Sequence, residues 1–318
     1  MRIVHENEFD FRTLEDEDIK LLLPNRRGRK NKGSFGKVLI IAGSSEIFGA
    51  AFLSAICAYR IGAGLVKICT DRANENAIKT LIPEALFSFY LDEDFKDDAF
   101  LKDSLSKSIE WADVVLCGPG IGISDNSRKM VEFLTCIRNK PIILDADALN
   151  ILSKNDGNAF KNLTSNFILT PHLMEMKRMV KNFSIDEIKD DMVYVLKTFN
   201  KDFSGITVLK DARTIVNFGE IFYLNQSGNS ALSKGGSGDC LAGIIAGLIA
   251  QYPDILSGFK SYSEKNPNGF DIEIIQKTIE IVSLAVFIHG KTADNYVKKN
   301  SEFSMLARDI GEELKHII

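Results

Sequence analysis

Short, mostly apolar runs recur along the chain and alternate with longer segments of helical character. These runs lie at residues 38–42, 65–69, 113–117, 141–145 and 167–170. Apolar runs of this length are typical of strands that are buried on both faces of a parallel sheet. Small residues follow the first run and predict a helix over residues 50–61, which makes the region a strand–helix–strand unit.

The second half of the chain predicts further strands and longer helices. Residues 207–210 and 214–216 predict a strand pair joined by a tight turn, and residues 221–224 predict another strand. Helices are expected over residues 240–251 and 274–295, and a last amphipathic helix ends the chain. The whole pattern predicts the α/β class, with one open, mostly parallel sheet and helices on both faces. In such sheets, ligands bind outside the carboxyl ends of the strands.

The pattern predicts one principal domain. Residues 1–24 are expected to form a polar leader with one short amphipathic segment from Leu14 to Leu23, and residues 25–318 are expected to form the domain. Residues 252–272 are rich in serine, glycine, asparagine, proline and charge, so we expect a loop or insertion there.

Composition excludes several classes of function. The chain has 318 residues and a formal net charge of −4, which argues against binding to duplex nucleic acid. The basic cluster at residues 26–32 either contacts phosphate or forms a solvated loop. No apolar stretch reaches the length of about 18 residues that a membrane span needs. The five cysteines show no C-x-x-C spacing and no secretory signal precedes them, so we expect reduced thiols and a cytoplasmic location.

The segment Lys234 to Cys240, with sequence KGGSGDC, carries the strongest chemical signal. It precedes a predicted helix, whose free N–H groups and positive dipole end favour anions, and its glycines allow a phosphate to approach the backbone. Asp239 would then lie beside that phosphate, where a general base for an attacking hydroxyl is needed. Alternatively, Asp239 only caps the helix and the glycines only form a turn.

Three other segments follow predicted strands. Gly118 to Gly122 are glycine-rich and could admit a ligand, although they do not match the dinucleotide fingerprint. Asp145 and Asp147 would point the same way on an extended chain and could organise Mg²⁺ through water, or they could cap the next helix. His172 follows Thr-Pro at a strand end, and either a ligand-binding role or a structural role fits it.

These motifs, in this order, resemble those of the ADP- or ATP-dependent NAD(P)H-hydrate dehydratases of the ribokinase-like superfamily. The resemblance runs from about residue 20 to the C-terminus. It is carried by the segments 32–37, 42–44, 48–51, 60–64, 83–84, 118–122, 145–149, 170–172, 210–214, 236–239 and 289–290.

The resemblance implies a role for each matching position. Ala50, Ala51, Gly122 and His172 would contact the hydrated dinucleotide, and Asp239 would meet its hydroxyl group. The residues that would hold the adenine nucleotide are Lys210, Asp211, Ala212, Arg213, Thr214, Gly236, Ser237 and Gly238. Asp211 replaces a glycine that is usual in the family, which could alter the nucleotide turn, and Ser237 replaces the more usual threonine.

The implied activity is repair of (S)-NADH or (S)-NADPH hydrate, with ADP or ATP as phosphoryl donor and Mg²⁺ as cofactor. Phosphorylation of the ring hydroxyl would make it a good leaving group, and the ring nitrogen would then expel phosphate. Two other functions are considered: a small-alcohol kinase of the same fold, such as a hydroxyethylthiazole kinase, and a non-catalytic nucleotide sensor. Family analogy also predicts a homo-oligomer, a tetramer, with the epimerase as a separate protein.

Overall fold

The computed structural model describes residues 1–6, 9–26, 31–96, 98–154, 159–265 and 271–318. Within these residues eleven strands form one sheet in the order β1-β2-β11-β10-β9-β8-β7-β6-β3-β4-β5. The strands are β1 (Arg2–Glu6), β2 (Phe9–Thr13), β3 (Lys37–Ile41), β4 (Leu65–Asp71), β5 (Leu86–Tyr90), β6 (Val114–Cys117), β7 (Ile142–Leu144), β8 (Phe167–Leu169), β9 (Ile206–Leu209), β10 (Ile215–Phe218) and β11 (Ile221–Leu224).

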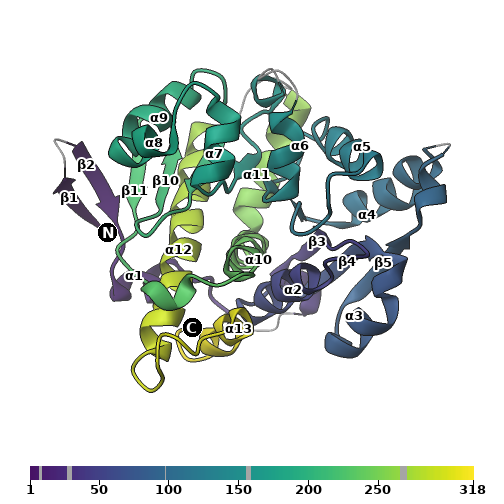
Figure 1. Cartoon of the computed structure of the whole chain (residues 1–318), viewed down its shortest axis with the longest axis horizontal. Helices are drawn as coiled ribbons and strands as arrows, with labels where there is room; N and C mark the ends of the chain where they lie inside the picture. Colours follow the sequence, from purple (N-terminus) through teal and green to yellow (C-terminus); the bar gives the residue numbers. More distant parts are fainter. Residues whose placement is uncertain (7–8, 27–30, 97, 155–158, 266–270) are drawn as a thin grey trace.

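Seven neighbouring strands, β3 to β9, run parallel to one another. Strand β10 is antiparallel to both of its neighbours, β9 and β11. Figure 1 shows the β1–β2 hairpin at one end of the molecule and β5 toward the other. The prediction of an open, mostly parallel sheet is therefore confirmed, and the predicted pair at residues 207–216 is the β9–β10 hairpin.

Helices cover both faces of the sheet, as predicted. They are α1 (Asp16–Leu22), α2 (Gly49–Arg60), α3 (Glu75–Leu81), α4 (Ser106–Trp111), α5 (Asp125–Leu134), α6 (Asp147–Ser153), α7 (Leu173–Val180), α8 (Ile185–Asp190), α9 (Met192–Phe199), α10 (Ser237–Ile249), α11 (Pro253–Lys265), α12 (Ile272–Tyr296) and α13 (Ala307–Leu314). Alternate strand residues divide between two cores. Ile40 packs with the α2, α10 and α12 side, whereas Leu39 and Ile41 pack with the α5, α6 and α7 side.

The prediction that the N-terminal segment is a polar leader is wrong, because its first residues form strands. Residues 2–13 form the β1–β2 hairpin, and β2 extends the main sheet by pairing with β11. Phe11 and Thr13 are buried on one face of β2, and charged residues alternate with them on the other face. This alternation gives the segment a polar composition although one face joins the core. The predicted amphipathic segment does form a helix, α1.

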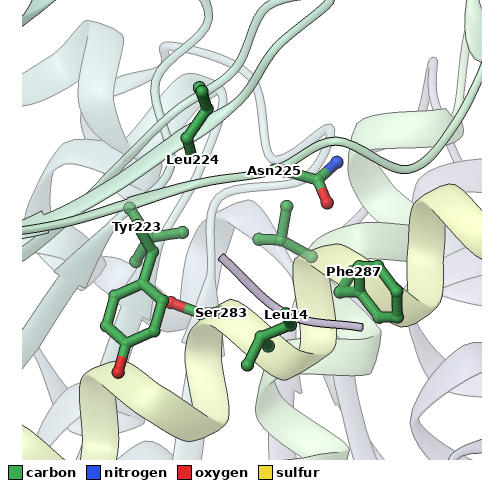
Figure 2. Close-up of a pocket in the computed structure, with 8 residues that line it drawn as sticks. Leu14, Tyr223, Leu224, Asn225, Ser283 and Phe287 are labelled. Atoms are coloured by element: carbon green, nitrogen blue, oxygen red, sulfur yellow. The ribbon is translucent and has the colours of Figure 1, made fainter. Parts of the chain in front are cut away.

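Leu14 connects this hairpin to the body of the protein. Figure 2 shows Leu14 beside α12, close to Ser283 and Phe287 of that helix and to Tyr223 of β11. The cavity among these residues measures about 10 Å³, which is about the smallest space that holds one water molecule. The close packing shows that the N-terminal segment is part of the same folded unit as the sheet.

The prediction of a loop at residues 252–272 is also wrong for most of this segment, because helix α11 occupies residues 253–265. Pro253 stands at its first position, where a missing N–H has no cost. Ile255 and Phe259 are fully buried four residues apart and form the apolar face of the helix. Residues 266–270 of this predicted loop lie outside the described residues.

The basic cluster at residues 26–32 is only partly within the described chain, because residues 27–30 lie outside it. Arg26 donates to the carbonyl oxygen of Gly62 and to the side chain of Gln251, both at 2.9 Å. Its guanidinium also lies 3.8 Å from the centre of the Phe35 ring. Arg26 therefore stabilises the entry to β3.

In the described chain no single helix is long and apolar enough to cross a membrane. One pair, α10 with residues 253–261, meets the length and composition criteria together, but the two helices are bent by 82° relative to each other.

Candidate active site

The site is organised around the N-terminus of helix α10. Gly236 precedes the helix with φ +92°, and Ser237, Gly238 and Asp239 form its first turn. Small residues hold this helix against α2: a Cβ at Gly243 would lie 2.1 Å from the carbonyl oxygen of Ser54. The hydroxyl of Ser54 donates to the carbonyl oxygen of Asp239 at 3.0 Å, so the contact with α2 fixes the start of α10.

The side chain of His289, in α12, stabilises the same turn. Its Nε2 lies 3.1 Å from the carbonyl oxygen of Ser237 and 3.2 Å from the hydroxyl of that residue. Since a carbonyl oxygen can only accept, Nε2 carries the hydrogen. Burial lowers the pKa of His289 to about 4, against the hydrogen bond to Ser237, so the ring is neutral at pH 7.

A buried ion pair lies opposite this helix terminus. The ammonium of Lys210, directly after β9, contacts the Asp145 carboxylate at 2.7 Å, and the Thr170 hydroxyl donates to the same oxygen at 2.6 Å. Asp145 is 1% exposed and the Lys210 side chain 17%. Burial lowers the pKa of Lys210, but attraction to Asp145, Glu175 and Asp239 outweighs it and raises the pKa overall. Lys210 is therefore protonated at pH 7.

Asp239 is half-buried at the first turn of α10. Burial raises the pKa of its carboxyl group to about 7, and repulsion from Asp145, Asp147 and Glu175 adds to that effect, while Lys210 opposes it. A carboxyl group with a pKa near 7 is well matched to a general base at neutral pH. The alternative that Asp239 acts as an N-cap is wrong for α10, because Gly236 occupies that position.

A cleft of about 740 Å³, here named the Lys210 cleft, opens beside this helix terminus. Its size suits a nucleotide. Of the predicted nucleotide-binding residues, Lys210, Asp211, Ala212, Thr214, Ser237 and Gly238 line it. Arg213 lies apart from them, with its guanidinium paired to Glu6 of β1. Gly236, the N-cap of α10, is not among the lining residues of the cleft.

Asp211 occupies the predicted nucleotide turn without a positive φ. The residue is exposed, and in the described chain the non-glycine residues with positive φ are Asp98, Ala146 and Lys181. The hydroxyl of Thr214 donates to the Asp211 carbonyl oxygen at 3.2 Å and closes the turn. The backbone at this position therefore does not require the glycine that is usual in the family.

A second hollow of about 600 Å³, here named the Gly122 hollow, lies near the glycine-rich segment that follows β6. Gly122 and Asp147 line it together with Ile47. The N–H of Gly122 donates to the Asp147 carboxylate at 2.9 Å. Ala50 and Ala51 begin α2 close by, and a Cβ at Gly120 would lie 3.1 Å from that of Ala50. Of the predicted substrate residues, Gly122 therefore lines this hollow, whereas Ala50 and Ala51 are 4% and 0% exposed and are not among its lining residues.

Asp239 is not among the residues that line the Lys210 cleft or the Gly122 hollow, but the pKa of its carboxyl group is influenced by the charge of Lys210, which lines the cleft, and of Asp147, which lines the hollow. His172 lines the Lys210 cleft, with its side chain about half exposed. Its Nδ1 accepts from the N–H groups of Met174 and Glu175, so the residue also caps α7. The structure is therefore compatible with both interpretations of His172, because the residue caps α7 and also lines the Lys210 cleft.

The expectation that Asp145 and Asp147 point the same way is wrong. Ala146 between them has φ +49° and ψ −117°, so the chain reverses instead of continuing extended. Asp145 turns to Lys210 and Asp147 turns to Gly122. In the part of the chain that the structure describes, no group of three or more His, Cys, Asp or Glu side chains is arranged to hold a metal ion.

Several residues of the Lys210 cleft were not predicted. They include Asn225, Ser227, Asn229 and His289. Asn229 and the N–H of Gly228 donate to Asp294 of α12, at 3.1 and 3.0 Å, and these bonds fix the loop that forms one wall. The only sequence signal for this wall was the run of turn-forming residues between β11 and α10.

The fold and this site define a protein of the ribokinase-like class. A structure of a ribokinase-like superfamily protein from Enterococcus faecalis matches with a TM-score of 0.79 and 26% identity, over 98% of this chain and 97% of that one. The family model described as NAD(P)H-hydrate dehydratase matches residues 38–316. The chain belongs to this family, and the resemblance that the motifs indicated is confirmed.

Individual relatives agree with the family. The ADP-dependent (S)-NAD(P)H-hydrate dehydratase of Listeria monocytogenes is 30% identical over 92% of this chain and 91% of its own length. The bifunctional NAD(P)H-hydrate repair enzyme of Coxiella burnetii is 29% identical over 97% of this chain, which spans only 56% of that enzyme. The Bacillus subtilis ADP/ATP-dependent dehydratase, co-crystallised with ATP and Mg²⁺, matches with a TM-score of 0.73 and 25% identity over 95% of this chain and 96% of that one.

Proposed function

We propose that this protein repairs (S)-NADH or (S)-NADPH hydrate by nucleotide-dependent dehydration. The observation that carries the proposal is the position of Asp239, with a pKa of about 7, at the first turn of α10, where the charges of Lys210 in the Lys210 cleft and of Asp147 in the Gly122 hollow both act on its carboxyl group. The nucleotide would occupy the first of these and the hydrated dinucleotide the second. Membership of the dehydratase family supports both assignments.

In the first step Asp239 takes the proton of the ring hydroxyl, and the hydroxyl oxygen attacks the terminal phosphorus of the nucleotide. The bond from that phosphorus to the bridging oxygen breaks, and its electron pair stays on the shortened nucleotide. The N–H group of Gly238 and the positive end of the α10 dipole stabilise the negative charge on the phosphoryl oxygens.

In the second step the lone pair of the ring nitrogen forms a double bond within the ring and expels the phosphate. The departing phosphate or water then takes a proton from the neighbouring ring carbon, and the electron pair of that C–H bond restores the double bond of the reduced nicotinamide. The oxygen of the hydrate thus leaves within inorganic phosphate. Neutral His289 keeps Ser237 in place throughout, since its hydrogen bonds do not depend on protonation near pH 7.

A bound Mg²⁺ would neutralise phosphate charge, which is the chemistry that this ion supplies in phosphoryl transfer. It usually keeps several waters and is held through few carboxylates plus the phosphates, so it does not need a cage of protein ligands. The described residues form no cage of three or more metal ligands. The helix terminus at Ser237 and Gly238 lines the cleft and is open to a nucleotide, which would bring the ion with its phosphates.

The decisive experiment incubates the protein with Mg²⁺, hydrated NADH or NADPH, and ADP or ATP. Recovery of the near-ultraviolet absorbance of reduced nicotinamide is expected with at least one nucleotide. A folded sample that restores no absorbance with either nucleotide would contradict the proposal. Phosphorylation of a small alcohol would then favour the kinase, and nucleotide binding without turnover would favour the sensor.

We also propose that residues 1–318 carry the dehydratase activity and no epimerase activity. The single sheet that includes the N-terminal hairpin supports this assignment. A mixture of the two hydrate epimers should be repaired in a fast and a slow phase, and added epimerase should remove the slow phase. The tetramer and the cytoplasmic location stay predictions, and light scattering would test the first of them.

A further inference from the structure

The ends of three neighbouring strands carry a chain of contacts that leads to the α10 terminus. Thr170 follows β8, Asp145 follows β7 and Lys210 follows β9, and the Thr170 hydroxyl and the Lys210 ammonium both meet one oxygen of Asp145. Asp145 and Thr170 are each 1% exposed. Their burial leaves the ammonium of Lys210 little freedom to move.

This ammonium faces the place where a phosphoryl group would bind. A Cβ at Gly238 would lie 3.4 Å from Lys210 Nζ, so the cation stands directly beside the first turn of α10. Lys210 also lines the cleft. A buried ammonium at a helix N-terminus adds a full charge to the partial charge of the terminus, and both favour an anion at the same point.

We infer that Lys210 is a catalytic residue that binds the phosphoryl group during transfer, and that Asp145 and Thr170 are its positioning residues. This inference rests on the proposed function and deepens it, since the family resemblance placed Lys210 only among the residues that hold the adenine nucleotide. The cation stabilises the charge that grows on the phosphoryl oxygens, and its contact with Asp145 keeps it aimed at them.

Substitutions at Lys210 and Thr170 distinguish a role of Lys210 in phosphoryl transfer from a role in nucleotide binding alone. Lys210→Met should lower kcat by about 10²- to 10³-fold, as loss of one preorganised donor does, with a smaller change in nucleotide KM. A kcat that is unchanged at saturating nucleotide, with a raised KM, would overturn the inference. Thr170→Val should lower kcat less, because Asp145 keeps its contact with Lys210. Lys197→Met is the matched control, since Lys197 pairs with Glu220 at 3.0 Å on the surface.

The pH profile provides a readout that a merely structural role would not move. Asp239 is faced by Lys210, Asp145, Asp147 and Glu175. Lys210→Met removes a positive charge, so the acid limb of kcat/KM should move to higher pH. Asp145→Asn removes a negative charge, so the limb should move to lower pH. Shifts in the same direction, or no shift, would contradict the inference.

A double variant guards against simple misfolding, because Lys210→Met alone leaves Asp145 buried without its partner. Lys210→Met with Asp145→Asn removes both charges and should fold while keeping the low kcat. Recovery of wild-type kcat in this double variant would mean that only charge balance matters, and would overturn the inference.

A binding measurement without the hydrate distinguishes failure of this inference from failure of the proposed function. In titration calorimetry, aluminium fluoride should tighten binding of AMP or ADP with Mg²⁺ to the wild type, because it mimics the transferring phosphoryl group. Lys210→Met should bind the nucleotide alone only slightly more weakly than the wild type and should lose that tightening. A variant that keeps the tightening would refute the role of Lys210, whether or not the wild type repairs the hydrate.

Discussion

The Lys210 cleft and the Gly122 hollow are formed by different groups of the protein. Around the cleft, charged side chains from separate strands and helices converge, and the charge of Asp145 raises the pKa of both Lys210 and Asp239. Around the hollow, the lining includes Gly122 and the side chains of Ile47, Asp147, Lys154 and Arg178, and the turn at Gly118 to Gly122 packs against the start of α2. The buried Lys210–Asp145 ion pair and the helix terminus therefore belong to the side proposed for phosphoryl transfer, and the glycine turn belongs to the side proposed for the dinucleotide.

The strongest test of this difference is Asp239→Asn. The amide keeps the shape of the side chain but cannot take a proton, so kcat should fall about 10²- to 10⁴-fold while calorimetry shows that the nucleotide still binds. In the wild type, Asp239 is protonated below its pKa of about 7. We therefore expect kcat/KM to rise with pH through about 7 and then level off. A variant with near wild-type kcat would show that another group is the base.

The next largest effect should come from backbone substitutions that compare the two ends of the glycine segment. A Cβ at Gly118, which has φ +130°, would lie 1.8 Å from the carbonyl oxygen of Asp145, so Gly118→Ala should cost about 3 kcal/mol of unfolding free energy. Gly122 has φ +72°, but a Cβ there would meet no heavy atom within 4 Å beyond its chain neighbours, and Gly122→Ala should cost only about 1–2 kcal/mol.

Urea unfolding measures both costs, and dinucleotide KM measures the effect on the hollow. Gly118→Ala should shift the unfolding midpoint more, because it pushes the backbone of Asp145 and so disturbs both sides of the site. Equal losses of stability would show that the backbone around Asp145 moves easily.

A smaller effect is expected at His172, where capping and ligand contact can be separated. His172→Ala removes the cap of α7 and should cost about 1 kcal/mol of stability, whereas asparagine is itself a good cap and should restore it. Both variants lose the imidazole, so by the family resemblance both should raise dinucleotide KM several-fold and leave nucleotide KM nearly unchanged. The position of His172 in the Lys210 cleft, which is assigned to the nucleotide, predicts the opposite pattern, and the two KM values decide between them. If His172→Asn restores the dinucleotide KM, the residue serves only α7.

The sequence predicted the parts of this protein whose signal is local. Buried parallel strands appear as apolar runs, and the anion-binding helix terminus appears as a glycine-rich segment before a helix, so β3, β6 and α10 were all placed. Strand β2 was missed because its buried face alternates with charge, and α11 was missed because its apolar face consists of few residues.

Contacts between distant segments could not be predicted in this way. The Lys210–Asp145 pair joins residues 65 positions apart, and the His289–Ser237 bond joins residues 52 apart. Neither residue type nor spacing identifies such partners before the strand order is known. The reversal at Ala146 is likewise invisible in the sequence, since alanine rarely has a positive φ.

The smallest effect is expected at Arg213, which lies between the predicted nucleotide turn and the N-terminal hairpin. Its guanidinium pairs with Glu6, and both side chains are partly exposed, so the pair should stabilise the fold by only about 0.2–1 kcal/mol. If Arg213 leaves Glu6 to contact the nucleotide, as the family resemblance implies, Glu6→Gln should lower nucleotide KM by up to about threefold because it frees the guanidinium. Arg213→Met should raise that KM by a similar factor, and Glu6→Gln should have no effect in the Arg213→Met background. Unchanged KM in all three variants, with equal small losses of stability, would mean that Arg213 only tethers the hairpin and that the charged side of the site ends at Lys210.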